Sequence, residues 1–320
     1  MTAWLSVVFA LLAALSNALA TVLQRRAART LPVSAKLRLG LLVDLLHRVV
    51  WLGGMLAVIA AACFQALALS EGALSVVQPL FILELPLALL IGRVLLGGRI
   101  SRGGWVGVGL IVVGLGSALT AAAPTIGNNH APVSRWVPAL VVCAVVIAVV
   151  VGAALRRGAG GVRAACFGAA TAIAYALTAA LMKDATYAWQ TGGPAEFFLS
   201  WQTYGFALVG VLALFLLENA MQSGPLTASQ PVLTLGDALV SLSLGVTLYD
   251  ERVRTGWWLL IEGAGVGLIL WGAVLLSRVA LARDLVGGEG GTPTEERAAG
   301  SNPGPAECER ASWKGRDTPI

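Results

Sequence analysis

Two acidic residues, Glu84 and Asp237, lie inside apolar stretches that are long enough to cross a lipid bilayer. Each follows a Gln-Pro pair, and the segments around the two pairs match, Gly72-Ala-Leu-Ser-Val-Val-Gln-Pro and Gly224-Pro-Leu-Thr-Ala-Ser-Gln-Pro. An acidic side chain within a membrane is costly, and it usually marks the route of an ion or a solute. The repeated segment therefore predicts a polar pathway near the middle of the membrane.

Proline strengthens this prediction because it lacks a backbone N–H and clashes with the carbonyl four residues earlier. We expect helix kinks at Pro79 and Pro231, and we expect the carbonyls of Ser75 and Thr227 to lose their helical partners. Unpaired backbone at membrane depth is tolerated only against protein or a water-filled cavity. The alternative interpretation is a pair of kinked packing helices whose acids are bonded to neighbouring side chains.

Amide side chains and a third acid complete the candidate pathway. Gln230 and Asp237 are seven residues apart and share a helix face, whereas Gln78 and Glu84 are six apart and would not on a straight helix. Two acids with amide and carbonyl oxygens suit a hard cation, and they equally suit a proton because burial disfavours a charged carboxylate. We assign no metal site. The pathway candidates are Glu84, Asp237, Gln78, Gln230, Ser75, Thr227, Glu262 and Asn17.

Composition indicates an all-α polytopic membrane protein. The chain has 320 residues, of which 57% are hydrophobic and only 12% are charged. A net charge of +5 is better explained by membrane topology than by nucleic-acid binding, so the expected surroundings are the lipid bilayer. The expected membrane helices cover about 3–24, 48–70, 73–95, 103–122, 134–154, 164–184, 197–217, 225–249 and 256–277, with a short interfacial helix at 32–47.

Several other residue types carry no predicted chemistry. No phosphate loop, nucleophile elbow or metal-ligand spacing occurs, so we expect neither an enzyme nor a cofactor. His130 lies in a predicted loop without a partner motif, and Lys183 is expected to extend to the membrane interface. Glycines four residues apart, Gly103/Gly107 and Gly263/Gly267, predict close helix packing.

The first four predicted helices recur as the last four. Matches at a nearly constant offset include Gly92/Gly245, Trp105/Trp258 and Gly114/Gly267, and Tyr175 takes the position equivalent to Asn17. Corresponding helices are an odd number of crossings apart, so the second copy is inverted, as in many secondary transporters. The expected organisation is a first repeat at 1–132, a connecting helix at 133–161, a second repeat at 162–282 and a disordered tail at 283–320.

Charge distribution predicts the orientation. With the N-terminus outside and the C-terminus in the cytoplasm, the outer segments hold only Arg135, Lys183, Arg252 and Arg254. The inner segments hold Arg25, Arg26, Arg29, Lys36, Arg38, Arg48, Arg93, Arg99, Arg102, Arg156, Arg157, Arg163 and Arg278. This asymmetry follows the positive-inside rule, and we expect a bacterial inner-membrane protein.

These features resemble the drug/metabolite transporter (EamA-like) superfamily over about residues 3–278. The resemblance lies in the duplicated half, the Pro-containing third helix, and Asp250-Glu251-Arg252, which looks like the superfamily's Gly-Glu-Arg element. Nine helices and the Gly72-x-Leu-x-x-x-Gln-Pro segment are nearest the NIPA-like branch, some members of which are associated with magnesium transport. The resemblance implies a transporter, but fold does not fix the substrate.

The predicted function is secondary transport by alternating access, with a divalent cation such as magnesium as the first substrate hypothesis. The alternative is proton-coupled export of a small metabolite or drug. A non-transporting membrane scaffold is the rival from another class, and its membrane acids would tolerate neutralisation without loss of function. A homodimer is compatible with all three hypotheses.

The topology prediction is tested with reporter fusions after residues 30, 128, 160 and 282. We expect cytoplasmic reporter activity at 30, 160 and 282 and extracytoplasmic activity at 128, because Lys and Arg are retained on the cytoplasmic side. Cytoplasmic activity at 128, or extracytoplasmic activity at 282, would contradict the predicted number of crossings.

Overall fold

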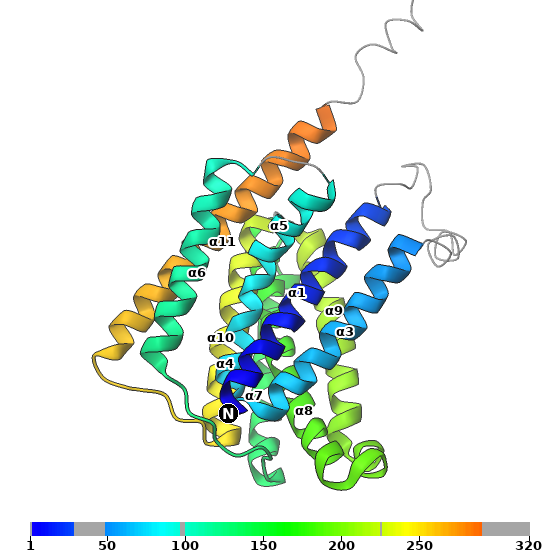
Figure 1. The fold of residues 1–320 in the computed structure, drawn as a ribbon, viewed down its shortest axis with the longest axis vertical. Helices are drawn as coiled ribbons and strands as arrows, with labels where there is room; N and C mark the ends of the chain where they lie inside the picture. Colours follow the sequence, from blue (N-terminus) through cyan, green and yellow to red (C-terminus); the bar gives the residue numbers. More distant parts are fainter. Residues whose placement is uncertain (1, 29–48, 97–99, 225, 290–320) are drawn as a thin grey trace, which may run out of the picture. The chain divides into compact units, whose positions relative to one another are not determined.

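The computed structural model describes residues 2–28, 49–96, 100–224 and 226–289. Residues 1–278 form one compact unit, and Val279–Ile320 form a second, of which the structure describes residues 279–289. Apart from loops and one isolated bridge, the described residues are helical. The elements are α1 (Thr2–Ala28), α3 (Val49–Glu71), α4 (Leu74–Leu80), the 3-10 turn η1 (Phe81–Leu83), α5 (Glu84–Leu96), α6 (Arg102–Ala122), α7 (Val133–Leu155), α8 (Gly161–Leu199), α9 (Trp201–Ser223), α10 (Leu226–Tyr249) and α11 (Trp258–Glu289) (Figure 1).

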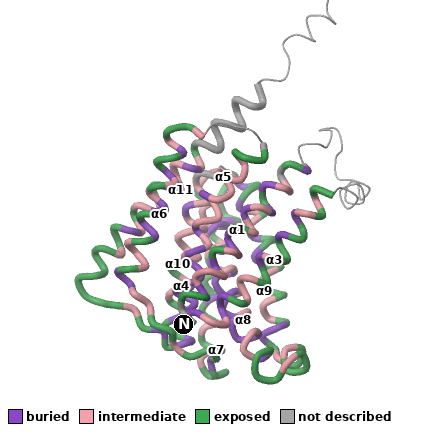
Figure 2. Tube along the Cα trace, in the orientation of Figure 1, coloured by how far each residue is buried: buried purple, intermediate pink, exposed green. Residues whose placement is uncertain are grey.

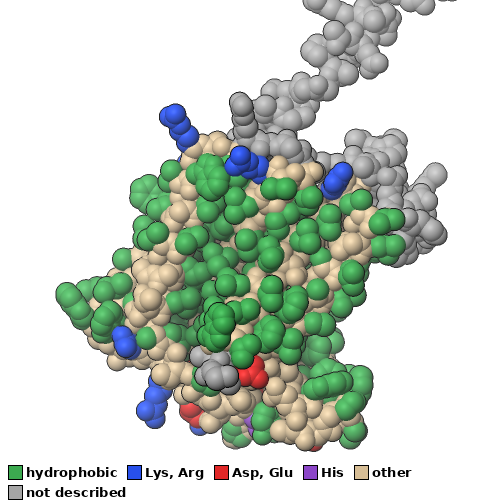
Figure 3. Space-filling model, viewed as in Figure 1, with side chains coloured by type: hydrophobic (Ala, Val, Ile, Leu, Met, Phe, Trp, Pro, Cys, Tyr) green, Lys and Arg blue, Asp and Glu red, His purple; other side chains and the backbone are tan. Residues whose placement is uncertain are grey.

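Nine candidate membrane spans occur among the described residues, with α4, η1 and α5 together forming one of them. Their apolar side chains cover the middle of the face in Figure 3, and Lys and Arg lie toward the ends of the helices. This confirms the prediction of an all-α multi-pass membrane protein. The interfacial helix expected at 32–47 lies outside the described residues.

Two helices continue past their predicted ends. The helix expected at 164–184 is α8, which runs from Gly161 to Leu199 as two helices joined by a kink at the non-helical Gly193. α11 continues to Glu289, so helix covers the start of the tail predicted as disordered from 283. Extending an existing helix avoids the cost of nucleation, which composition alone does not reveal. Residues 290–320 lie outside the described part.

α8 is the most buried helix of the bundle, as the purple trace in Figure 2 shows. Its buried face is rich in alanine, which lets neighbouring backbones approach closely. α8 packs against α9, α10, α7 and α3, while α1 packs against α3 and α5. The fully buried alanines of α8 include Ala164, Ala170, Ala172, Ala174, Ala176 and Ala180.

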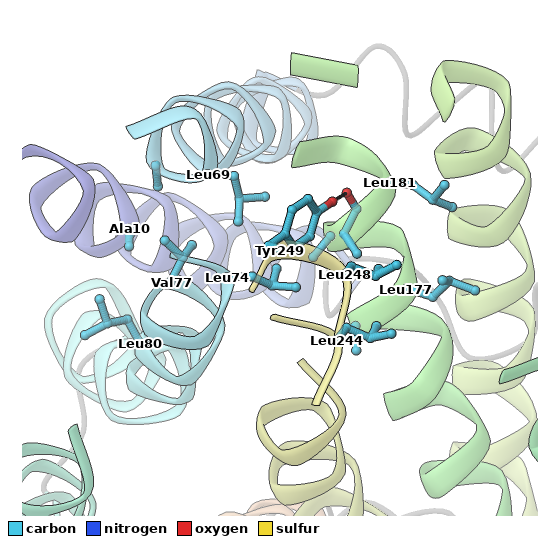
Figure 4. Packing of buried hydrophobic residues seen from close by; sticks show 14 of the residues in the cluster. Ala10, Leu69, Leu74, Val77, Leu80, Leu177, Leu181, Leu244, Leu248 and Tyr249 are labelled. Atoms are coloured by element: carbon cyan, nitrogen blue, oxygen red, sulfur yellow. Dashed lines mark hydrogen bonds between the residues drawn. The ribbon is translucent and has the colours of Figure 1, made fainter. Parts of the chain in front are cut away.

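A hydrophobic cluster joins α8 to the start of α4 and the end of α10. Figure 4 shows Leu74 of α4 on the side of Leu244 and Leu248 of α10, Val77 beside Ala10 of α1, and Tyr249 next to α8. Burying each large aliphatic side chain stabilises the fold by about 1.5–3 kcal/mol. This cluster fixes the ends of α4 and α10, which carry the repeated Gln-Pro segments.

The predicted third membrane helix is interrupted close to Pro79. α4 ends at Leu80, a 3-10 turn covers Phe81–Leu83, and α5 begins at Glu84. Loss of the proline N–H and the clash of its ring weaken the helical ladder at this point. α10, by contrast, is assigned as one continuous helix through Pro231.

Glycine packing joins α6 to α11, and on α11 it uses a face that the sequence spacing did not single out. A Cβ at Gly114 would lie 2.6 Å from the carbonyl oxygen of Gly265, and one at Gly265 would lie 2.7 Å from that of Gly114. Gly107 and Gly272 make a second approach of this kind. Gly263 and Gly267 instead face open space. α11 carries glycines on opposite faces, so spacing alone could not tell which face packs.

Gly114→Ala should destabilise the protein, because the added methyl group meets backbone atoms that cannot move aside. Overpacking of this kind costs roughly 1–3 kcal/mol of unfolding free energy. Gly116→Ala is the matched control, since nothing lies within 4 Å of a Cβ at Gly116. Thermal unfolding in detergent measures both variants. Equal unfolding midpoints would show that α6 and α11 do not depend on this contact.

Candidate functional site

The acids of the bundle fall into two groups that differ in position and in partners. Glu84 and Asp237 lie near the middle of their membrane spans. Asp184, Asp250 and Glu251 lie toward the end of the bundle that carries the start of α1 and the end of α10, called here the N-terminal end (Figure 1).

Glu84 is the first residue of α5, immediately after the 3-10 turn. Its Oε2 accepts a hydrogen bond of 2.7 Å from Nδ2 of Asn17, and its Oε1 accepts one of 3.3 Å from the hydroxyl of Thr21. Asn17 and Thr21 are four residues apart and share one face of α1. Both donors are neutral, and no described Lys, Arg or His forms an ion pair with Glu84.

Asp237 lies midway along α10, next to α8. Ser241, one turn later, donates a long hydrogen bond of 3.5 Å to its Oδ1. Tyr175 of α8 is within electrostatic range of Asp237, Glu84 and Glu218. Asp237, like Glu84, takes part in none of the ion pairs found among the described residues. Tyr175 is therefore the group in electrostatic range of both predicted pathway acids.

The glutamines next to the prolines differ in environment. Gln78 is only 4% exposed, and its Nε2 is a buried donor without a partner in the described part of the chain. A buried amide left unpaired costs about 1–3 kcal/mol, so such a group is unusual outside a functional site. Gln230 is half-buried, and its backbone carbonyl accepts a bond from Thr234. The side chain of Thr227 lies outside the described part.

Glu262 lies apart from the other pathway acids. It lines a small cavity of about 50 Å³ between α4, α6, α10 and α11, to which Ser75 and Pro79 also contribute. The other lining residues are apolar, and neither Glu84 nor Asp237 is among them. The cavity is large enough for water, which needs two or more polar partners there. Of the predicted pathway residues, Asn17 is hydrogen-bonded to Glu84, whereas Ser75 and Glu262 line a cavity that does not include Glu84.

An ion pair between Lys183 and Glu251 is buried at the N-terminal end of the bundle. Both residues are only 1% exposed, and Nζ lies 3.0 Å from Oε1. Lys183 also donates to the carbonyl of Gly72, and its ammonium lies 4.5 Å from the centre of the Tyr249 ring. The prediction that Lys183 extends to the interface is wrong, because α8 continues well beyond it and buries it against α3, α4 and α10.

The carboxylate of Glu251 caps the first turn of α4. It accepts hydrogen bonds from the backbone N–H of Leu74 at 2.7 Å and of Ser75 at 3.0 Å, and from the Ser75 hydroxyl at 2.6 Å. Ala73, at the N-cap position, has no side-chain hydrogen bond of its own. A negative charge at this point also complements the helix dipole. Ser75, which was predicted to line the pathway, thus also donates two hydrogen bonds to Glu251.

Asp184, next to Lys183 in α8, holds the loop before α7. Its Oδ2 accepts a bond of 2.7 Å from Nε1 of Trp136, and its Oδ1 accepts one of 3.3 Å from the backbone of Ala131. His130 lies 3.5 Å from the same carboxylate and stacks on Tyr187. No sequence motif marks these partners of His130, because they come from residues far apart in the chain. Adjacent Lys and Asp within a long apolar helix were the available signal.

The loops at this end are also bonded to each other. Thr125 and Arg252 form an antiparallel bridge, and Asn128 and Arg135 both contact the carboxylate of Asp250. Arg254 donates from its backbone to the carbonyl of Ala122. These bonds connect the loop before α7 with the loop after α10.

Comparison with known proteins adds one relative. The chain is 29% identical over 282 residues to an uncharacterized protein of Corynebacterium glutamicum, a match that covers 87% of this chain and 95% of that protein. No protein-family model matches the chain, and no solved structure matches it. Its class, a multi-pass helical membrane protein, thus rests on its own sequence and structure.

Lys183→Met should lower the free energy of unfolding by roughly 3–5 kcal/mol, because it leaves the buried Glu251 carboxylate without its cation. Arg135→Met is the matched control at the same end of the bundle. It breaks an ion pair with Asp250 whose side chains are 39% and 52% exposed, and it should cost only about 0–1 kcal/mol. Denaturant unfolding in detergent compares the two variants. Equal losses of unfolding free energy would contradict the prediction that the buried pair stabilises the protein more than the exposed pair.

Proposed function

We propose that this chain is a secondary membrane transporter in which Glu84 and Asp237 bind the cation that is transported or that drives transport. The observation that carries the proposal is the presence of two mid-span acids with no cationic partner among the described residues. A carboxylate in an apolar medium must be protonated or paired with a cation, because isolated burial of its charge is too costly. The bundle pairs Asp184, Asp250 and Glu251 at its N-terminal end, whereas Glu84 and Asp237 have no such partner among the described residues, which supports binding of a mobile cation.

The packing of the helices supports an inverted duplication. α1 packs on α3 as α8 packs on α9, and α1 packs on α4 and α5 as α8 packs on α10. α6 and α11 then meet each other through glycines. Because the spans alternate in direction, α1 and α8 run oppositely. On this proposal α7 is the connector between the halves, and the two acids are equivalent positions of the two copies.

The cation is a proton or a metal ion. Glu84 accepts hydrogen bonds from Asn17 and Thr21, and Asp237 accepts one from Ser241, so the two acids share no ligand. Separate carboxyl groups with neutral donors suit the gain and loss of a proton. A divalent ion would need more oxygen ligands around one centre. We therefore rank proton-coupled transport of a small solute first. Magnesium transport, which the superfamily resemblance suggests, is the second candidate.

Location and orientation complete the proposal. The relative from Corynebacterium supports a bacterial source, and the nine apolar spans among the described residues support a cell membrane. Among the described residues, Arg26, Arg93 and Arg102 lie at the opposite end of the bundle from Asp250 and Glu251 (Figure 1). Positive charge at that end supports a cytoplasmic location for it and an extracytoplasmic location for the N-terminal end.

Glu84→Gln and Asp237→Asn should abolish gradient-coupled flux without lowering stability. Neutralising a carboxyl group in an apolar site removes a desolvation cost, and neither change strands a partner cation. Purified protein in liposomes is assayed with proton, magnesium and metabolite gradients, and unfolding is measured in parallel. Glu71→Gln, a half-buried acid at the end of α3, is the matched control and should retain flux.

The outcomes separate the hypotheses. Flux driven by a proton gradient supports the first candidate, and electrogenic magnesium flux without a proton gradient supports the second. A scaffold predicts no flux in any gradient and no phenotype for the two variants. Loss of flux that merely follows loss of folded protein would assign both acids to packing instead.

A further inference from the structure

In the part of the chain that the structure describes, the hydrogen bonds between the two halves of the bundle are confined to one end. Residues 72–75 and 122–131 of the first half bond to residues 183–184 and 249–254 of the second half. Every hydrogen bond that the structure describes between residues 2–132 and 161–278 belongs to this set. The bundle is thus fastened at its N-terminal end.

The buried centre of this fastening is the Lys183–Glu251 pair. Lys183 belongs to α8 and bonds to the carbonyl of Gly72, two residues before α4, whereas Glu251 follows α10 and bonds to the first turn of α4. Gly245 leaves the space for the carboxylate, since a Cβ there would clash with Oε2 of Glu251. Gly127 similarly allows its loop to approach the backbone of Tyr249. Two charges are therefore packed into a site that neighbouring glycines keep open.

A buried ion pair is a poor choice if its purpose is stability alone. Apolar residues of similar volume are often as stabilising, because each charge loses its hydration on burial. An ion pair differs from an apolar contact in how it opens. When water enters, both charges are hydrated again, so the separated state is not penalised as exposed apolar surface would be. The chemistry of the pair suits a contact that forms and breaks.

The pair is also mechanically joined to the proposed cation site. Glu251 holds the first N–H groups of α4, and α4 leads through Gln78 and the 3-10 turn directly to Glu84. On the other side, α10 carries Asp237 and ends at Tyr249, two residues before Glu251. Both acids therefore lie on segments whose ends meet at the pair.

We propose that Lys183 and Glu251 form the closure that seals the N-terminal end of the transport pathway, so that solute reaches Glu84 and Asp237 only from the opposite end while the pair is intact. The proposal rests on the transport function proposed above and adds which residues must separate during each cycle. Release of Glu251 from Leu74 and Ser75 frees the first turn of α4 and lets α4 and α10 move apart at this end.

The test measures water access from each side. In a variant whose four cysteines are replaced by alanine, Ser241→Cys places a thiol one turn from Asp237. A membrane-impermeant methanethiosulfonate reagent is applied to right-side-out and to inverted vesicles. With Lys183 and Glu251 intact, labelling is expected only from the end opposite the N-terminal end. Equal labelling from both sides would overturn the proposal.

Glu251→Gln is then added to the same background. It strands the Lys183 charge in the closed state, whereas the open state hydrates that charge, so the population shifts toward opening at the N-terminal end. Labelling from that end should rise by roughly tenfold or more. The matched control is Glu71→Gln at the end of α3, which neutralises a half-buried acid outside this set of bonds and should leave labelling unchanged. Unchanged labelling in folded Glu251→Gln protein overturns the closure.

A second variant keeps the test decisive where Glu251→Gln does not fold. Thr125→Cys and Arg252→Cys together place two thiols at the antiparallel bridge, where the expected Cα separation suits a disulfide. Oxidation should stop flux by holding the end shut, and reduction should restore it. Full flux in the oxidised protein overturns the closure.

The outcomes also distinguish this proposal from the transport function. If labelling shifts as expected but no gradient drives solute flux, the closure stands and the proposed transport fails. If the protein transports solute but neither variant changes access or flux, transport stands and the closure fails.

Discussion

The cost of placing a carboxylate in an apolar medium governs the arrangement of this protein. Each buried acid must be protonated, paired or hydrogen-bonded, and the bundle uses different solutions at different depths. At the N-terminal end, Glu251 is satisfied by Lys183 and by two backbone N–H groups of α4. At mid-span, the donors to Glu84 in the described part of the chain are the neutral side chains of Asn17 and Thr21. The difference separates a carboxylate with a buried cationic partner from one that has only neutral donors among the described residues.

Helix interruption makes both solutions available within one segment. α3 ends at Glu71, and α4 begins three residues further on, at Leu74. The first N–H groups of α4 therefore have no helical partner and are available to Glu251. The 3-10 turn Phe81–Leu83, which follows Pro79, then ends α4 and places Glu84 at the start of α5. A continuous helix would satisfy its own backbone and would offer neither the N-terminus nor the break.

Small residues allow the charged groups to be enclosed. Alanines along α8 let four other helices pack around it, and this packing buries Lys183 and Asp184 away from the membrane interface. Glycines at Gly245 and Gly127 leave room for the Glu251 carboxylate and for the loop beside Tyr249. Between membrane helices, where lipid supplies no hydrophobic driving force, such close approach is a main source of stability.

The sequence by itself determined the class of the protein, the approximate positions of most membrane spans, the break near Pro79 and the identity of the mid-span acids. These follow from local properties, namely apolar length, proline chemistry and the cost of an acid in an apolar stretch. Only the tertiary structure decided the partners. Spacing could not show that Asn17 serves Glu84, that Lys183 is buried, or that Gly265 rather than Gly263 packs on α6. Each of these depends on which helix face meets which neighbour, and that is set by contacts between residues far apart in the chain.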